Sequence, residues 1–332
     1  MKPKVSVIIT IYNREKYIEK CARSLFEQTL DMIEYVFIDD ASKDESLAQL
    51  SKVIEDYPDR RPFVKVISLA VNAGVANARN VGLANVTGEY VIHADSDDWV
   101  DADMYERLYQ KAIESDADIV GCNICHEYSS RTSFLKQNYA ETVDDNISRL
   151  IRGSIHPSLC TSLTRTSLIK ENNLSFLSGL NMGEDLYFNL NLYLYAHIIE
   201  SVSFSPYHYR HTEDSSSFHH NRSTINSGIE IGRRIEQLMR KEGCYESFAD
   251  EIEYRKFSLK LSLVIDFNDY ENYRYWLKTF PETHRHIWRY IEIDWKLRIE
   301  LWFAAHHMFL VAKSIKIILD LRHRLCSFKT KK

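Results

Sequence analysis

Three aspartates lie within four positions of this chain, directly after an apolar stretch. Asp95, Asp97 and Asp98 belong to the segment HADSDDW and follow the run YVI. Carboxylates this close repel one another, and they persist together where solvent dilutes their charge or a cation offsets it. Mn²⁺ and Mg²⁺ prefer oxygen ligands, and Mg²⁺ is usually held by one or two carboxylates together with substrate phosphates. The segment therefore predicts either a divalent-cation site or an acidic turn that caps the helix expected near residues 101–103.

Two acidic pairs elsewhere in the chain have the groups for related chemistry. Asp39 and Asp40 follow an apolar run, where a carboxylate can accept hydrogen bonds from a nucleobase or a ribose, or can cap the next helix. Glu184 and Asp185 open an amphipathic helical pattern, where the helix dipole alone also favours an acidic pair. From the residues alone, the ligand-binding and the helix-terminus interpretations both stay open for each pair.

A fourth feature combines a glycine with a cation. Within residues 72–80, Gly74 would let the backbone approach a ligand, and Arg79 can clamp a diphosphate with two hydrogen bonds. The chain contains no G-x-G-x-x-G and no G-x-x-x-x-G-K-[ST]. The dinucleotide-dependent oxidoreductases and the P-loop proteins therefore lose their main sequence support.

Hydrophobic periodicity predicts the elements that position these residues. β-branched apolar runs predict buried strands, and apolar residues at helical spacing predict helices between them. This alternation indicates an α/β fold with a doubly wound, mostly parallel sheet and crossover helices. The expected strands are 5–11, 34–38, 64–69 and 89–94; the expected helices are 14–28 and 45–57, with a loop and a helix over 72–86.

Ligands bind such sheets at the carboxyl ends of the strands. The pair Tyr12-Asn13, the pair Asp39-Asp40 and the cluster 95–98 each directly follow a predicted strand. We therefore expect these three places to meet at one edge of the sheet, although they lie far apart in the chain.

The second half of the chain is organised differently. Residues 126–180 are less regular and rich in Ser, Thr and Asn, and from about residue 225 the chain is expected to be mostly helical. Before residue 126 we expect a helix at 104–115 and a short strand at 119–123. After residue 180 we expect a helix at 184–196 and an extended segment at 203–211.

Composition fits a globular protein and argues against several functional classes. The 332 residues are 45% hydrophobic and 27% charged, with a net charge of −5. Residues 285–332 carry 11 Lys and Arg against 4 Asp and Glu, whereas the other 284 residues carry 31 against 43. An acidic body argues against nucleic-acid binding, which needs a basic groove. No apolar run of about 18 residues predicts a transmembrane helix, and we expect no signal peptide.

The basic end of the chain predicts one amphipathic helix over residues 299–325. His306, Lys313 and Lys316 fall on a polar stripe that continues through residues 320 and 323, and the rest is broadly apolar. Two interpretations stay open. The helix packs against the catalytic domain or a second subunit, as in a homodimer, or residues 299–332 make peripheral contact with an anionic membrane.

The six cysteines are scattered along the chain, which is typical of reduced thiols in a cytoplasmic protein. Cys122 and Cys125 form one C-x-x-C, but no second pair exists to complete a zinc site, so we expect no metal there. The expected location is the cytoplasm, with the inner face of the plasma membrane as the site of any lipid contact.

Four motifs in order carry a resemblance to a known family. They are PKVSVIITIYNREKYIEKCARSLFEQTL, VFIDDASKDES, NAGVANARNVGLANVTGEYVIHADSDDW and GED. Over residues 3–105, with thinner support to 217, they resemble the inverting, non-processive bacterial family 2 glycosyltransferases, which have a GT-A fold. The resemblance implies a catalytic domain over 1–217, with a nucleotide-sugar half (1–105) and an acceptor half (106–217). Residues 218–332 would form a mostly helical C-terminal region with a basic amphipathic end.

The resemblance implies that a UDP-sugar binds at the shared edge of the sheet. Tyr12 and Asp39 would hold the uracil, with Asn13 and Asp40 nearby. Arg79 would lie near the ribose and the diphosphate of the donor.

It also implies the residues of the chemical step. Asp95 would contact the ribose or the donor sugar, and Asp97 would bind Mn²⁺ or Mg²⁺ through the diphosphate. Asp185 would be the general base that deprotonates the acceptor hydroxyl, with Glu184 as its neighbour or substitute.

The chain also has two basic residues near the end of the resemblance and two differences from the usual family motifs. Arg210 and His211 resemble basic positions that meet the diphosphate in some members, so Arg210 is a candidate donor ligand and His211 a candidate metal ligand; ordinary surface roles are the alternative. Ala41 replaces the glycine of the common DDGS, which affects loop geometry more than chemistry. The Q-x-x-R-W motif typical of processive members is absent, which favours the addition of a single sugar.

The expected function is transfer of one sugar, with inversion, to a glycan or lipid-linked acceptor in cell-surface polysaccharide synthesis. A cation would offset the charge of the leaving diphosphate, and a carboxylate would act as general base. The alternatives are the same fold with a GDP- or dTDP-sugar, and a sugar-nucleotide-binding protein without turnover. Intact Asp97 and Asp185 argue against the second alternative.

Overall fold

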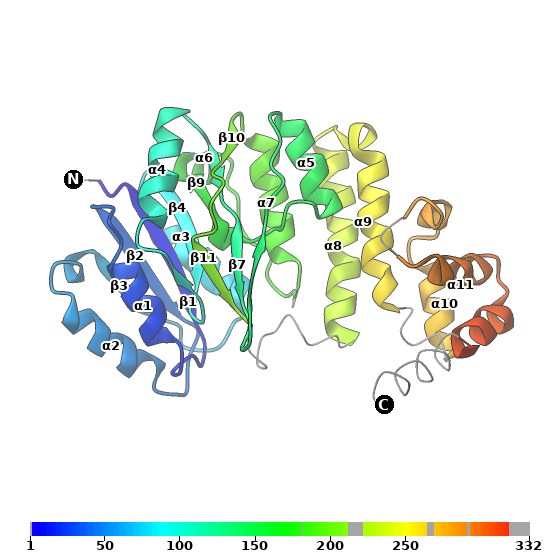
Figure 1. The fold of residues 1–332 in the computed structure, drawn as a ribbon, viewed down its shortest axis with the longest axis horizontal. Helices are drawn as coiled ribbons and strands as arrows, with labels where there is room; N and C mark the ends of the chain where they lie inside the picture. Colours follow the sequence, from blue (N-terminus) through cyan, green and yellow to red (C-terminus); the bar gives the residue numbers. More distant parts are fainter. Residues whose placement is uncertain (1, 181, 212–221, 264–268, 291–292, 319–332) are drawn as a thin grey trace. The chain divides into compact units, whose positions relative to one another are not determined.

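The apolar run of residues 5–11 forms an inner strand of a seven-stranded sheet (Figure 1). The computed structural model describes residues 2–180, 182–211, 222–263, 269–290 and 293–318. The first four strands pair in parallel, with β1 between β2 and β4 and with β3 on the outer side of β2. Their bounds are β1 Val5–Ile11, β2 Ile33–Asp39, β3 Val64–Ser68 and β4 Tyr90–Asp95.

Helices cover both faces of this parallel part, which is why its inner strands read as continuous apolar runs. Val7 and Ile9 of β1 share one buried cluster with Cys21 and Leu25 of α1. On the opposite face, a Cβ on Gly82 of α3 would come within 2.5 Å of the side chain of Ile8, so this close approach requires glycine. These helices are α1 Ile18–Phe26, α2 Ser46–Asp56 and α3 Val75–Asn85.

The remaining strands of the first unit build the other half of the sheet and a second, smaller sheet. In the large sheet the order is β10-β6-β9-β4-β1-β2-β3, and β9 runs antiparallel to both of its neighbours. The small sheet has the order β5-β11-β7-β8. The bounds are β5 Trp99–Val100, β6 Ile119–Gly121, β7 Ile124–Glu127, β8 Thr132–Leu135, β9 Ser162–Arg165, β10 Ile199–Ser201 and β11 Tyr207–Arg210. The helices are α4 Met104–Glu114, α5 Val143–Arg152, α6 Thr166–Glu171 and α7 Glu184–Tyr195.

The predicted α/β fold with a mostly parallel sheet and a helical C-terminal region is confirmed. Two local predictions were wrong. The helix expected from residue 14 begins at Ile18, because Tyr17 has a φ of −122°, outside the helical range, and its amide closes a turn by donating to the carbonyl of Arg14 at 2.9 Å. Residues 126–180 are more regular than expected, since they contain α5 and α6 and the strands β8 and β9. These two strands have only four residues each, too few to show a period of two.

The chain divides into two compact units, residues 1–219 and 220–332. The second unit is helical, and its core includes the buried side chains of Ile229, Phe257 and Trp276. Its elements are α8 Arg222–Lys241, a turn at Tyr245–Phe248, α9 Ala249–Leu261, α10 Tyr270–Lys278, a turn at Pro281–His286 and α11 Trp295–Ala305.

The single helix predicted for residues 299–325 is interrupted, which corrects that prediction. Helix α11 ends at Ala305, and His307 adopts a left-handed conformation with φ of 62°. The amide of Met308 donates to the carbonyl of Phe303 and that of His307 to Ala304, which is the Schellman arrangement that closes a helix. A separate helical segment follows at residues 309–318. Positions 320 and 323 of the predicted stripe lie outside the described residues.

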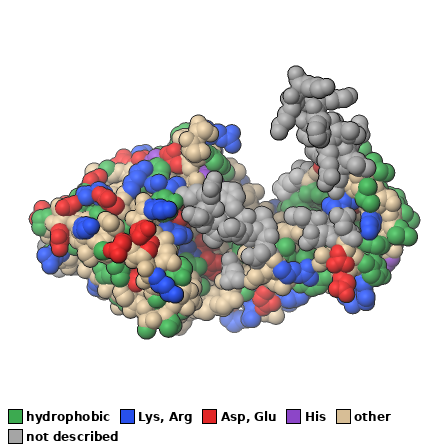
Figure 2. All heavy atoms as spheres, turned by 90° about the horizontal axis from the view of Figure 1, so that it is seen from below, with side chains coloured by type: hydrophobic (Ala, Val, Ile, Leu, Met, Phe, Trp, Pro, Cys, Tyr) green, Lys and Arg blue, Asp and Glu red, His purple; other side chains and the backbone are tan. Residues whose placement is uncertain are grey.

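No helix among the described residues combines the length and the apolar character needed to cross a membrane. On the face shown in Figure 2, Lys and Arg side chains of the described residues are interspersed with Asp and Glu.

Candidate active site

The register of the parallel strands brings the predicted site residues to one edge of the sheet. Ile11, the last residue of β1, is paired with Asp39, and Thr10 is paired with Asp95. Tyr12 follows β1 directly, and its side chain is 42% exposed. Residues from three separate stretches therefore lie at the carboxyl ends of neighbouring strands, as expected from the alternating pattern.

The carboxylate of Asp40 holds the loop that leads into α3. Its Oδ1 accepts a hydrogen bond from the amide of Ala73 at 2.8 Å, and its Oδ2 accepts one from Gly74 at 2.9 Å. Gly74 has a φ of 87°, a conformation that glycine adopts without the steric cost of a Cβ. Because both oxygens of Asp40 bind backbone, this residue fixes the start of the helix that carries Arg79.

Asn13 and Asp39 organise the neighbouring loop. Asn13 Oδ1 accepts from the amide of Lys43 at 2.8 Å, and Asp39 Oδ1 accepts from the amide of Ser42 at 3.1 Å. Between them, Ala41 has a φ of 61°, in the region that favours glycine. The replacement of glycine noted in the sequence therefore places a Cβ at a left-handed position.

Asp98 joins the acidic turn to the small sheet. The side chain is buried, its Oδ2 accepts from the Tyr207 hydroxyl at 2.6 Å, and its Oδ1 accepts from the amide of Arg210 at 2.7 Å. Burial, followed by the charges of Asp95 and Asp97, raises the pKa of Asp98 well above its ordinary value. This geometry gives Asp98 a structural role at the acidic turn. It does not cap α4, because the residue at the N-cap of α4 is Asp103.

Asp97 faces two arginines at the same corner. Its Oδ2 lies 3.3 Å from Nε of Arg14, and its backbone oxygen accepts from Nε of Arg210 at 3.0 Å. Burial and the charge of Asp95 raise the pKa of Asp97, while the two arginines oppose that rise. Oxygen donors with an excess of negative charge suit a hard divalent cation.

A buried arginine connects the acidic turn to the start of α7. Arg79 Nη2 lies 3.4 Å from Oδ1 of Asp95, and Arg79 Nη1 donates to Oε1 of Glu184 at 3.1 Å and also to Oδ1 of Asp185. Arg79 itself is only 5% exposed. Gly183, with φ of 90°, precedes the helix and directs its first turn toward this cluster. The structure thus gives Arg79 three carboxylate partners within the protein. Its place near the ribose and the diphosphate of the donor stays a prediction.

The environment of Asp185 suits proton transfer near neutral pH. Burial is the main reason why the pKa of Asp185 is raised, and the negative charges of Glu184 and Asp95 raise it further. The positive charge of Arg79 opposes this rise, and the resulting pKa of Asp185 is about 7. The side chain is still 31% exposed, so a substrate can reach it. A general base is most effective when its pKa lies near the working pH.

His211 lies in an aromatic cluster beside the end of β11. Its Nε2 is 2.8 Å from Nδ1 of His126, and its ring stacks on Tyr128 with the centroids 4.0 Å apart. Burial, followed by the charge of His126, lowers the pKa of His211, which favours the neutral imidazole that binds metals. Its assignment as a metal ligand stays a prediction.

Comparison with known proteins shows the family of this chain. The model of the family Glycosyl transferase family 2 matches residues 6–170, which include all of β1 except Val5, the two aspartate motifs and α3. The chain belongs to glycosyltransferase family 2. As in other members, its fold is GT-A, and the chain is a glycosyltransferase.

Similar proteins agree with this family. The uncharacterized glycosyltransferase EpsJ of Bacillus subtilis is 32% identical over 65% of this chain and 63% of its own length. The cholesterol galactosyltransferase of Borreliella burgdorferi is 29% identical over 80% of this chain and 75% of its own. Among solved structures, S. aureus TarS 1–349 in complex with UDP-GlcNAc has a TM-score of 0.72 at 24% identity, covering 96% of this chain and 92% of TarS 1–349. The similarity to TarS 1–349 shows that the two chains share a fold.

Sequence reasoning missed two residues that contact the acidic turn. Arg14 pairs with Asp97, and Tyr207 donates to Asp98. The signal for Arg14 was its position beside the strand end that already carried Tyr12 and Asn13. Tyr207 had no comparable signal, because its partner lies 109 residues away in the chain.

Proposed function

We propose that this glycosyltransferase transfers a single sugar from a UDP-sugar, with inversion, to a glycan or lipid-linked acceptor in cell-surface polysaccharide synthesis. The observation that carries the proposal is the contact of Arg79 with both Asp95 and Asp185. Asp185, whose pKa is about 7, thereby lies beside the edge of the sheet where we expect a nucleotide-sugar to bind, which supports its proposed role as the base.

The donor proposal rests on the exposed ring of Tyr12 and on Asp39 at the end of β2. An aromatic ring beside a carboxylate can stack on a base and accept from its N–H. TarS 1–349, which binds UDP-GlcNAc, motivates the choice of uracil. A GDP- or dTDP-sugar is the alternative donor.

The metal proposal rests on the acidic turn. Asp97 would hold Mn²⁺ or Mg²⁺, with Asp95 beside it and His211 as a further ligand. When bound, the cation would offset the charge that develops on the diphosphate leaving group. The carboxylate oxygens present fit a hard cation. Burial and then the charge of Asp95 raise the pKa of Asp97, and a bound cation would offset that neighbouring charge.

The chain's own residues then account for the transfer. Asp185 would take the proton of the acceptor hydroxyl, and Arg79 would hold the Asp185 carboxylate in place while moderating its pKa. Arg210, which binds the backbone at Asp97, would bring its charge to the diphosphate. Attack on the sugar from the face opposite the diphosphate would invert the anomeric configuration in one step, without a covalent enzyme intermediate.

We also propose that residues 299–332 contact an anionic membrane, where a lipid-linked acceptor would lie. In the segment 309–318, Leu310 is 75% exposed and Ile318 is 62% exposed, and Lys313 and Lys316 belong to the same segment. Replacing Leu310 and Ile318 together by Asp in the full-length protein should reduce co-sedimentation with anionic vesicles. Equal sedimentation of both proteins would contradict membrane contact. A wild-type dimer that the same variant separates would instead indicate that this surface covers a second copy.

A panel of nucleotides tests the donor proposal. Thermal unfolding should be measured with UDP, GDP and dTDP, each with Mn²⁺ and with chelator. We expect UDP with Mn²⁺ to stabilise the protein most and the chelator to remove most of that shift, since a ligand stabilises in proportion to its binding. A larger shift with GDP or dTDP would refute uracil recognition, and the absence of any nucleotide shift would refute the donor site itself.

A further inference from the structure

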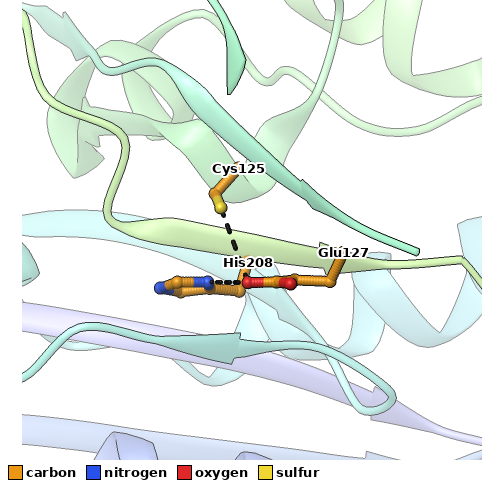
Figure 3. Close-up of side chains that lie close together, drawn as sticks. All are labelled: Cys125, Glu127 and His208. Atoms are coloured by element: carbon orange, nitrogen blue, oxygen red, sulfur yellow. Dashed lines mark hydrogen bonds and ion pairs between the residues drawn. The ribbon is translucent and has the colours of Figure 1, made fainter. Parts of the chain in front are cut away.

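Three side chains with metal-binding atoms converge on one face of the small sheet (Figure 3). Cys125 and Glu127 lie two residues apart on β7, and His208 is the direct cross-strand partner of Cys125 on β11. Their ligand atoms all lie within 4.8 Å of one another. Glu127 Oε1 is 3.6 Å from the Cys125 sulfur and 2.8 Å from Nδ1 of His208. Alternate residues of one strand and their neighbour on the next strand thus present sulfur, oxygen and nitrogen to one point.

The outer contacts of the same side chains resemble those of metal ligands. Nε2 of His208 lies 3.0 Å from Oδ1 of Asp101, and the second oxygen of Glu127 accepts from the Thr132 hydroxyl at 2.9 Å. A histidine that binds metal through one nitrogen usually donates its other N–H to a carboxylate, and ligating carboxylates are themselves hydrogen-bonded. Both outer hydrogen-bond partners, Asp101 for His208 and Thr132 for Glu127, are present in this structure.

We propose that Cys125, Glu127 and His208 form a zinc site, with water as the fourth ligand. Zinc accepts sulfur, nitrogen and oxygen at about 2.0–2.3 Å, so tetrahedral ligands stand roughly 3.3–3.8 Å apart. The sulfur–oxygen separation of 3.6 Å already falls in that range, and the nitrogen–oxygen separation of 2.8 Å needs to open by about half an ångström. The mixed set distinguishes this site from the all-oxygen turn at Asp97, which suits a harder cation.

Charge and access are compatible with zinc. The Cys125 sulfhydryl is buried, while the Glu127 and His208 side chains are 23% and 18% exposed, which leaves a route for the ion. Burial, followed by Glu127, raises the pKa of Cys125 to about 11, so binding would release one proton from sulfur to solvent. The bound thiolate and carboxylate would then neutralise Zn²⁺. Lys20, whose ammonium lies 3.0 Å from the centroid of the Trp99 ring, stays outside the ligand set.

The effect of this site would be to fix β7 against β11. Strand β11 also carries Tyr207 and Arg210, which hold Asp98 of the acidic turn. Zinc would therefore stabilise the corner of the donor site through the sheet beside it, without touching the substrate. The proposed site differs from the C-x-x-C pair for which the sequence predicts no metal: Cys122 lies in the main core cluster, and only Cys125 belongs to the new ligand set.

Cobalt is the sharpest probe, because Co²⁺ bound to a thiolate gives a charge-transfer band in the near ultraviolet and Co²⁺ bound only to oxygen and nitrogen does not. The full-length, chelator-treated protein should be titrated with Co²⁺ and then with Zn²⁺, in the Asp97→Asn background so that the oxygen site does not compete. We expect one thiolate-bound Co²⁺ per chain, displaced by Zn²⁺. Cys125→Ser should remove the band, and Cys244→Ser, in the other unit, should leave it.

A second variant keeps the test independent of folding. Asp101 is 53% exposed, and Asp101→Ala removes the acceptor that faces Nε2 of His208, so Zn²⁺ affinity should fall about 10- to 100-fold while the thermal unfolding of the metal-free protein is unchanged. Co²⁺ binding without a thiolate band, a band that survives Cys125→Ser, or a Zn²⁺ affinity unaffected by Asp101→Ala would each overturn the proposal.

Discussion

Replacing Glu184 by Gln removes one of the two carboxylates that share a single nitrogen of Arg79. Glu184 Oε1 lies 3.1 Å from Nη1 of Arg79, and Asp185 Oδ1 accepts from the same nitrogen. The negative charge of Glu184 is one of the causes that raise the pKa of Asp185 to about 7. The variant keeps the size and the hydrogen-bonding oxygen of the side chain, so it alters mainly the charge next to the proposed base.

The expected shift follows from Coulomb's law. Two oxygens bound to one nitrogen lie within about 6 Å of each other, where two unit charges interact by roughly 3 kcal/mol at an effective dielectric constant of 20 and about 0.7 kcal/mol in water. Because the Asp185 side chain is 31% exposed, we expect a value between these limits, which corresponds to a pKa lowered by about 1. The acid limb of the activity profile should therefore move from about pH 7 to about pH 6.

Release of UDP from a UDP-sugar, measured across the range from about pH 5 to 9, reports this limb. At about pH 6 the base would be roughly 9% ionised in the wild type and 50% in the variant, so relative activity there should rise about fivefold. Glu171→Gln, at an exposed position on α6, is the matched control and should leave the profile unchanged. A limb that stays in place or moves to higher pH in Glu184→Gln would refute Asp185 as the group that titrates.

Three further variants test other parts of the account. Asp97→Asn should abolish the Mn²⁺-dependent part of UDP binding in calorimetry, and retained metal dependence would exclude Asp97 as the ligand. Ala41→Gly should stabilise the protein by about 0.5–1 kcal/mol in urea unfolding. An alanine in the left-handed conformation costs about 1–2 kcal/mol, and part of that gain is lost because glycine has more freedom in the unfolded chain. An unchanged or lower stability would contradict this. Tyr207→Phe should cost about 1–3 kcal/mol in the same assay, because one oxygen of buried Asp98 loses its donor. A cost near zero would mean that this hydrogen bond adds nothing.

The sequence was most informative where a pattern is local and repeated. Strand β1 was predicted with both its ends, because seven β-branched or small residues in a row admit few other structures. The meeting of Asp39 and Asp95 at one edge followed from a rule about parallel sheets rather than from any contact visible in the chain. The short helix-stop at His307 was missed because a Schellman closure usually has glycine at that position, and here histidine occupies it.

Partners that are far apart in the chain were the least predictable. Arg79 and Asp185 are 106 residues apart, and only folding shows that the arginine binds this carboxylate in addition to Asp95. The same limit applies to β9, which is inserted antiparallel between β4 and β6, since three or four residues give no sign of their direction. The motifs identified the residues that gather, and tertiary structure was needed to show which of them touch.

Asp185→Asn, measured for both binding and turnover, tests the central claim most directly. UDP binding with Mn²⁺ should stay within about threefold of the wild type, because Asp185 is proposed to act on the acceptor, and UDP release from the UDP-sugar should fall by about 10²- to 10⁴-fold, the usual worth of general-base catalysis. Turnover at the wild-type rate in this variant would show that another group removes the proton, and the account of this site as a transferase centre built around Asp185 would be wrong.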